Sequence, residues 1–130
     1  MYLLDTNICV AVIKGERAVL DAVKPRRNDC ALPIIVVSEL YKGAYCSTKI
    51  ASNLKTINGL IRRLPIINFD SDAAEDSGRI QSELRKIGRP TGDMDALIGA
   101  IARSNSATLV THNTADFQSI QGLKLEDWLS

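Results

Sequence analysis

Near its N-terminus the chain reads Tyr2-Leu3-Leu4-Asp5-Thr6-Asn7. The three apolar residues predict a short buried strand, and the polar trio behind them is typical of a helix start. A similar order returns at Cys30-Ala31-Leu32, where Pro33 ends the expected strand and a helix is expected from Val37 or Ser38. Short apolar strands that alternate with helices predict an α/β fold with a mainly parallel sheet.

The rest of the chain continues this alternation. Further strands are expected at residues 66–69 and 108–111. Helices are expected over residues 7–13, 16–24, 48–63, 71–87 and 93–104. In the 48–63 segment, apolar residues repeat at helical spacing along one stripe: Ile50, Leu54, Ile57, Ile61 and Leu64. The sequence contains no repeat, low-complexity tract or linker, so we expect one domain over residues 1–130.

The composition excludes several classes of protein. Of 130 residues, 45% are hydrophobic and 24% are charged, which is typical of a globular chain and not of a disordered one. No apolar run approaches the roughly 20 residues of a membrane span, and a signal peptide is not expected. Three cysteines without a CxxC spacing argue against a disulfide framework and a zinc cluster. A reducing cytoplasm is therefore the expected location.

Charge is unevenly distributed, although the net charge is only +1. Residues 14–63 hold ten Lys and Arg against four Asp and Glu, whereas residues 64–130 hold six against ten. A basic half is compatible with a polyanionic partner such as nucleic acid. The uneven charge is also explained by two solvated surfaces, and on the charge pattern alone this interpretation is preferred.

Four acidic residues are expected at one edge of the sheet. In parallel sheets the functional crevice lies beyond the carboxyl ends of the strands. Four separated segments bring acids to that edge: Asp5, Glu39, Asp95 and Asp116. Gathered carboxylates repel one another, and a hard cation that prefers oxygen ligands, such as Mg²⁺, relieves the repulsion. With a single histidine and no thiol pair, no other metal is indicated.

Each acid also has a purely structural interpretation. Asp5 can cap the helix behind it, Glu39 can be a solvated helix residue, and Asp116 can be an exposed turn residue. Asp93 and Asp95 are two helical steps apart and so point in different directions. Following Gly92, Asp93 suits the helix N-cap. We therefore assign Asp95 to the pocket.

Three more polar residues have roles that stay open. Thr6 and Asn7 can orient Asp5 or a metal-bound water, or can simply cap a helix. Asn113 can bridge to Asp116 or only shape the turn. His112 has no partner nucleophile in the sequence, so we interpret it as a structural or peripheral loop residue.

Several of these segments together resemble a known family. Leu3-Leu4-Asp5-Thr6-Asn7, Ser38-Glu39-Leu40, the segment 92–98 and the segment 108–117 resemble PIN domains, and VapC-type toxins of toxin–antitoxin pairs in particular. The resemblance covers essentially the whole chain. It implies a five-stranded parallel sheet flanked by helices and RNA cleavage that depends on Mg²⁺ or Mn²⁺. It places metal-site acids at Asp5, Glu39, Asp95 and Asp116, and it implies a small antitoxin partner and a homodimer.

In this interpretation the basic segment holds the flanking RNA backbone. The candidate residues are Lys42, Lys49, Lys55, Arg62 and Arg63. Single-stranded or loop RNA is the expected substrate, because side chains do not readily enter the deep groove of an RNA duplex.

Two other functions compete with that of a ribonuclease. A receiver-like domain that accepts a phosphoryl group on an acidic Mg²⁺ pocket has a similar length and sheet. It needs an acid pair after the first strand and a lysine after the last, and the sequence has neither. A binding module with a decayed site is disfavoured because all four acids are present.

Overall fold

A computed structural model describes residues 1–130. Its strands form one parallel sheet in the order β3-β2-β1-β4-β5, with β1 at the centre. Their bounds are β1 (Tyr2–Leu4), β2 (Cys30–Pro33), β3 (Ile66–Ile67), β4 (Thr108–Val110) and β5 (Lys124–Glu126). The predicted α/β fold with about five parallel strands is confirmed.

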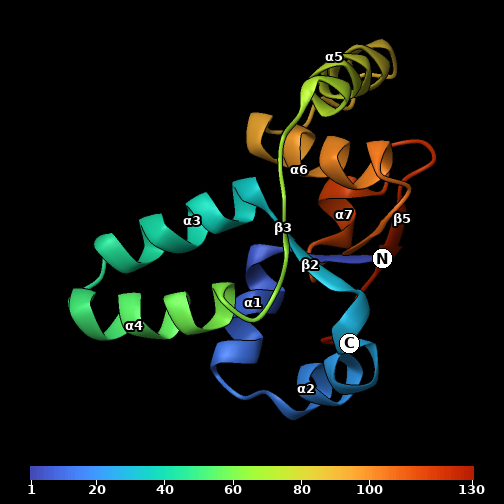
Figure 1. Cartoon of the computed structure of the whole chain (residues 1–130). Coiled ribbons are helices and arrows are strands. Elements are labelled where there is room, and N and C mark those ends of the chain that lie inside the picture. Colours follow the sequence, from blue (N-terminus) through green and yellow to red (C-terminus); the bar gives the residue numbers. More distant parts are fainter.

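The helices cover both faces of this sheet (Figure 1). In Figure 1, α5, α6 and α7 lie above the strands, α1 and α2 lie below them, and α3 and α4 project to the left as a pair. Their bounds are α1 (Thr6–Ile13), α2 (Arg17–Val23), the 3₁₀-helix η1 (Lys24–Asp29), α3 (Ile34–Tyr45), α4 (Ile50–Ile61), α5 (Ser71–Lys86), α6 (Asp93–Ser104) and α7 (Thr114–Phe117). None of these helices is long and apolar enough to cross a membrane.

Several element boundaries differ from the sequence-based expectation, and three of the differences have a clear local cause. Helix α3 begins at Ile34 instead of Val37 or Ser38, because Pro33 stands in an extended conformation and the helix starts directly behind it. Helix α2 ends at Val23, and the chain continues as η1, which tolerates Pro25 in its first turn. Strand β3 has two residues instead of four, because only Ile66 and Ile67 pair with β2.

Helix α6 packs closely against its neighbours, and it carries Asp95. Its inward face consists of small and branched apolar residues, including Gly99 and Ala102. A Cβ atom at Gly99 would lie 3.0 Å from the side chain of Ile120. The absence of a side chain at this position therefore sets the approach of α6 and fixes where its first turn lies.

Arg103 ties α6 to α5. Its guanidinium donates to both carboxylate oxygens of Asp76 at 2.8 and 2.9 Å, and to Glu83 at 3.0 Å. It also donates to the backbone oxygen of Gln121 at 3.0 Å. The Arg103 and Asp76 side chains are only 16% and 15% exposed, so water does not readily replace these bonds.

We expect Arg103→Ala to lower the free energy of unfolding by about 2 kcal/mol, because it strands two carboxylates that are partly removed from water. Urea denaturation measures the change. Arg79→Ala is the matched control, since the Arg79–Glu75 pair is 66% and 70% exposed and is expected to contribute less than about 0.5 kcal/mol. Equal losses in the two variants would contradict the assigned role of Arg103.

Candidate active site

Asp5 lies at the carboxyl end of the central strand and has two roles. Its backbone N–H donates to the oxygen of Val110 at 2.9 Å, which continues the pairing of β1 with β4. Its Oδ1 accepts from the backbone N–H of Thr6 at 2.9 Å, so Asp5 caps α1. The residue is 7% exposed. The capping interpretation is therefore confirmed, and the cap uses only one of the two carboxylate oxygens.

Thr111 fixes the second oxygen of Asp5. The fully buried Thr111 hydroxyl donates to Asp5 Oδ2 at 2.8 Å. The same hydroxyl oxygen accepts from the backbone N–H of Asn113 at 3.1 Å and from Asn7 Nδ2 at 3.5 Å. Sequence reasoning missed this residue, because its partner Asp5 lies 106 positions away and no local pattern marks the hydroxyl.

Thr6 and Asn7 connect Asp5 to other segments. The Thr6 hydroxyl donates to Glu39 Oε1 at 2.9 Å, which joins the start of α1 to α3. The Asn7 side-chain oxygen accepts from the backbone N–H of His112 at 3.0 Å. These two residues therefore do not orient Asp5 directly through their side chains. Thr6 instead holds Glu39, and Asn7 holds the loop that carries Thr111.

Asp95 and Asp116 complete the acidic pocket. Asp95 lies in the first turn of α6, and Asp116 lies in α7. Burial raises the pKa of Asp95 to about 6, and the negative charges of Asp5, Asp116 and Glu39 add to this effect. Burial also raises the pKa of Asp5, while hydrogen bonds from Thr111 and Thr6 act in the opposite direction. The fold thus brings the four predicted acids within electrostatic reach of one another.

One expectation about the surrounding residues was wrong. Gly92, not Asp93, occupies the N-cap of α6, and Asp93 is exposed as the first helical residue. Gly92 adopts the extended conformation of a cap, so the helix starts one residue earlier than it would with Asp93 as the cap. Arg89 borders a hollow with Asp95 and Asp116.

Two residues of the last loop lie at its edge. The backbone oxygen of Asn113 accepts from the N–H of Asp116 at 3.0 Å. His112 Nδ1 lies 3.1 Å from Asp127 and its side chain is 53% exposed, which agrees with a peripheral position.

The donor chemistry of the pocket suits a hard divalent cation. All four side chains offer carboxylate oxygens, and their mutual repulsion disfavours the ionised, metal-free state. No three of them converge into a ready-made coordination shell. Some cations, such as Mg²⁺, keep several waters and are held by only one or two carboxylates together with substrate phosphates.

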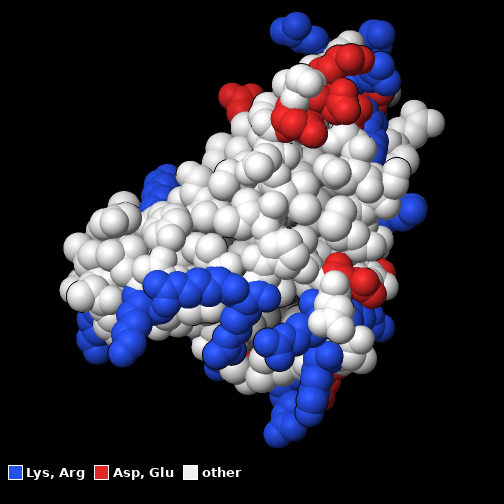
Figure 2. All heavy atoms as spheres, viewed as in Figure 1, with Lys and Arg blue, Asp and Glu red and all other residues white.

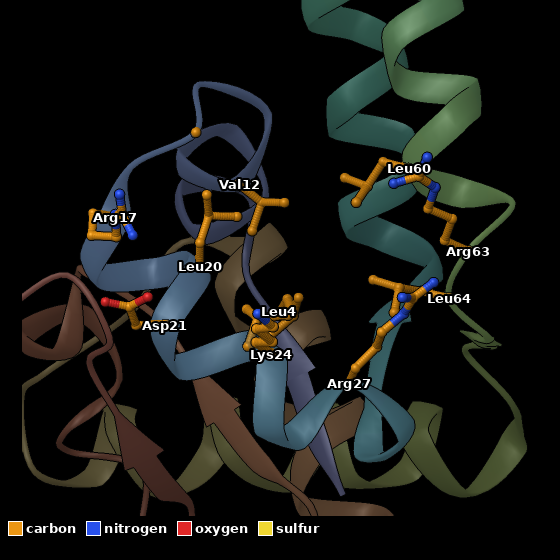
Figure 3. A pocket seen from close by; sticks show the side chains of 12 residues that line it. Leu4, Val12, Arg17, Leu20, Asp21, Lys24, Arg27, Leu60, Arg63 and Leu64 are labelled. Atoms are coloured by element: carbon orange, nitrogen blue, oxygen red, sulfur yellow. The ribbon is translucent and has the colours of Figure 1, made fainter.

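The basic residues expected to bind RNA do not all lie near this pocket. Lys42 borders a hollow that also contains Thr6 and Glu39. Arg63 instead lines a separate hollow of about 530 Å³, which none of the four acids borders (Figure 3). The other three candidates are exposed in α4 or at its ends: Lys49, Lys55 and Arg62. Figure 2 shows basic side chains along the lower part of the molecule and acidic ones over α5.

The raised pKa of Asp95 predicts a pH-dependent stability of the metal-free protein. Because the folded pKa of about 6 lies above the ordinary value of 3.8, the folded state holds the proton more tightly. Stability contributed by this carboxyl is therefore present below about pH 4 and is lost as the pH rises to about 6. After allowance for solvent screening we expect about 1 kcal/mol.

Thermal melts in EDTA at pH 4.5 and 7 test this expectation. Asp95→Asn is expected to melt several degrees above the wild type at pH 7, and close to it at pH 4.5. Asp93→Asn removes the same formal charge from an exposed residue and serves as the control. A gain for Asp95→Asn that does not grow with pH would contradict the electrostatic origin.

Thr111→Val is expected to lower cleavage activity by about 10- to 100-fold and stability by about 1–3 kcal/mol. The substitution keeps the volume but leaves Asp5 Oδ2 and the N–H of Asn113 without their partner. Thr111→Ser retains the hydroxyl and is expected to keep most of the activity. RNA cleavage rates and urea denaturation of both variants provide the comparison. If valine and serine behave alike, the hydroxyl does not position Asp5.

Comparisons with known proteins agree along nearly the whole chain. The profile of the PIN domain matches residues 2–123. The tRNA(fMet)-specific endonuclease VapC of Shigella flexneri is 36% identical over 128 residues, which span 98% of this chain and 97% of that protein. Ribonuclease VapC2 of Haemophilus influenzae is 34% identical over 129 residues, 98% of each chain. In the crystal structure of VapBC2 from Rickettsia felis bound to a DNA fragment from their promoter, one chain matches at a TM-score of 0.92 and 34% identity, covering 98% of both chains.

Proposed function

This chain belongs to the VapC family of PIN-domain ribonucleases, and we propose that it hydrolyses RNA phosphodiester bonds with Mg²⁺ as the toxin of a toxin–antitoxin pair. Mn²⁺ is expected to substitute for Mg²⁺. The single observation that carries the proposal is the gathering of four carboxylates from four segments: Asp5, Glu39, Asp95 and Asp116. The receiver-like alternative is not favoured, since the relatives above are ribonucleases.

Asp5, Glu39, Asp95 and Asp116 would hold the metal ion, and their side chains are kept in place in different ways. When bound there, Mg²⁺ would offset the charge of the phosphodiester and lower the pKa of an attacking water. Asp5 contributes a carboxylate that Thr111 and Thr6 hold in one orientation, so little order has to be created on binding. Glu39 is fixed by the Thr6 hydroxyl. Asp95 releases a proton at about pH 6 in the metal-free protein, so its carboxylate is available as a ligand above that pH.

Substrate and partners follow from the relatives by similarity. A relative is named as an endonuclease specific for tRNA(fMet), which makes tRNA the first RNA to test. Structural neighbours are VapBC complexes, and we propose a small antitoxin as the partner of this chain. Exposed apolar side chains support such a partner or a homodimer, since Ile50 is 42% and Leu20 is 38% exposed. We further propose that residues 1–130 form one domain and that the protein acts in the cytoplasm.

The test is incubation of the purified protein with total RNA, in Mg²⁺ and in excess EDTA. Discrete fragments are expected in Mg²⁺ only, and Asp5→Asn, which keeps the shape of the side chain, is expected to produce none. Labelling with acetyl phosphate is expected to fail. Intact RNA in every lane would contradict the proposed function, and a labelled protein would favour the receiver-like alternative.

A further inference from the structure

Two hollows border the Thr6–Glu39 pair. One, here called the Gly43 cleft, measures about 310 Å³ and is formed by α1, α3 and α4. The other measures about 330 Å³ and includes Lys42 and Met94. Both contain Thr6, Glu39 and Gly43. Glu39, one of the four acids, therefore borders open space on both sides of α3.

The Gly43 cleft has the chemistry of a site for a flat, partly polar ring. Its walls are mainly aliphatic, with side chains from all three helices: Val10, Ile13, Leu40 and Ile57. Asn53 and Thr56 are exposed and add acceptor oxygens, since Asn53 Nδ2 already donates to Ser47 Oγ and the Thr56 hydroxyl to the Ser52 carbonyl. Ligand sites typically combine such an apolar surface with a few polar groups that fix orientation.

Cationic side chains mark both hollows. Lys14 lines the Gly43 cleft and Lys42 lines its neighbour, and apart from Glu39 no other charged residue borders either one. Neither lysine takes part in a salt bridge. A chain with a negative charge on each unit would therefore meet a lysine on either side of Glu39. These charges favour a polyanion over a neutral peptide as the ligand.

Gly43 keeps this space open without a structural need for glycine. A Cβ atom built there would meet no atom within 4 Å, and the backbone lies in the regular helix α3. Glycine in a helix interior costs about 1 kcal/mol relative to alanine. The fold accepts this cost at a position that both hollows share.

We propose that the Gly43 cleft binds the nucleobase of a single-stranded RNA nucleotide next to the scissile phosphate. The inference rests on the proposed function, because it takes the acids as the place where the phosphate is cut. A phosphodiester held at Glu39 has its neighbouring nucleotide within reach of the cleft. Unstacked bases of single-stranded RNA are commonly read by such contacts to their faces and edges.

The test combines a substitution with removal of individual bases. Gly43→Leu fills the space shared by the two hollows, and Gly59→Leu is the control. Gly59 lies in α4 and lines neither hollow, and a Cβ atom added to it would also meet no atom within 4 Å. The substrate is a short RNA that the wild type cleaves at one bond, made with one abasic nucleotide at each position in turn.

For the wild type, we expect one abasic position beside the cleaved bond to lower kcat/KM on the order of tenfold. Gly43→Leu is expected to lower kcat/KM for the intact RNA by a similar factor and to lose the penalty at that position. Such non-additivity identifies a shared contact, which a general structural defect does not produce. Gly59→Leu is expected to retain both the wild-type rate and the wild-type abasic penalty.

Binding gives a readout that does not depend on cleavage. In an Asp95→Asn background, Gly43→Leu is expected to weaken binding of the intact RNA on the order of tenfold, and Gly59→Leu to leave it unchanged. If the abasic penalty is the same in Gly43→Leu as in the wild type, the base site is overturned while the proposed function stands. Weaker binding of an antitoxin by Gly43→Leu would not rescue the base site, because an unchanged abasic penalty shows that the base does not contact residue 43. A wild type that cleaves no RNA overturns both.

Discussion

Asp95→Asn is expected to reduce RNA cleavage roughly a thousandfold, which corresponds to a loss of several kcal/mol of transition-state stabilisation. The side chain keeps its shape but loses the charge that faces Asp5, Asp116 and Glu39. Asp93→Asn, two residues earlier and exposed, is expected to cleave RNA at close to the wild-type rate. Initial rates on one RNA under saturating Mg²⁺ measure both variants.

This pair of substitutions separates the pocket acid from the peripheral one. An Asp95→Asn variant that has lost cleavage activity, together with an Asp93→Asn variant that has kept it, supports the assignment. The reverse result would exchange the two roles. Because the same Asp95→Asn change is expected to stabilise the metal-free protein, lost activity could not be attributed to unfolding. A site that is costly in stability and necessary for activity is the usual signature of function.

Removal of divalent metal is expected to abolish cleavage completely. Four carboxylates with no offsetting cation would repel an incoming phosphodiester. Mg²⁺ at roughly millimolar concentration is expected to restore activity, since a hydrated ion held by few carboxylates binds weakly. Mn²⁺ is expected to substitute, whereas Ca²⁺ is expected to bind and support little turnover, because its coordination is larger and less regular.

Thermal melts add a readout that needs no substrate. Mg²⁺ is expected to raise the melting temperature of the wild type, because a ligand that binds only the folded state stabilises it. The increase is expected to be smaller in Asp95→Asn and unchanged in Asp93→Asn. Full cleavage in excess EDTA would refute the metal-dependent mechanism.

The sequence predicted the elements whose signals are local. The strand at Tyr2–Leu4 and the helix at Asp93–Ser104 lie as expected, because apolar periodicity and flanking polar residues mark their ends. The gathering of the acids was also predictable, since a parallel sheet brings the carboxyl ends of its strands to one edge.

What the sequence could not predict depends on contacts between distant segments. Thr111 and Asp5 are 106 positions apart, and no local pattern distinguishes this hydroxyl from that of an ordinary strand residue. Helix α3 starts earlier than predicted because Pro33 both ends β2 and leads directly into the helix. The predicted cap at Asp93 was wrong. It relied on the general preference of aspartate for cap positions, whereas Gly92 adopts the extended conformation of the cap.

The basic side chains that gather over the lower part of the molecule in Figure 2 have a consequence for kinetics. With a net charge of only +1, the molecule has little long-range attraction to a polyanion as a whole. The gathered basic side chains nevertheless attract an approaching RNA locally before contact. Encounter rates are therefore expected to fall steeply as ionic strength rises and the Debye length shrinks to about 8 Å at roughly 0.15 M salt.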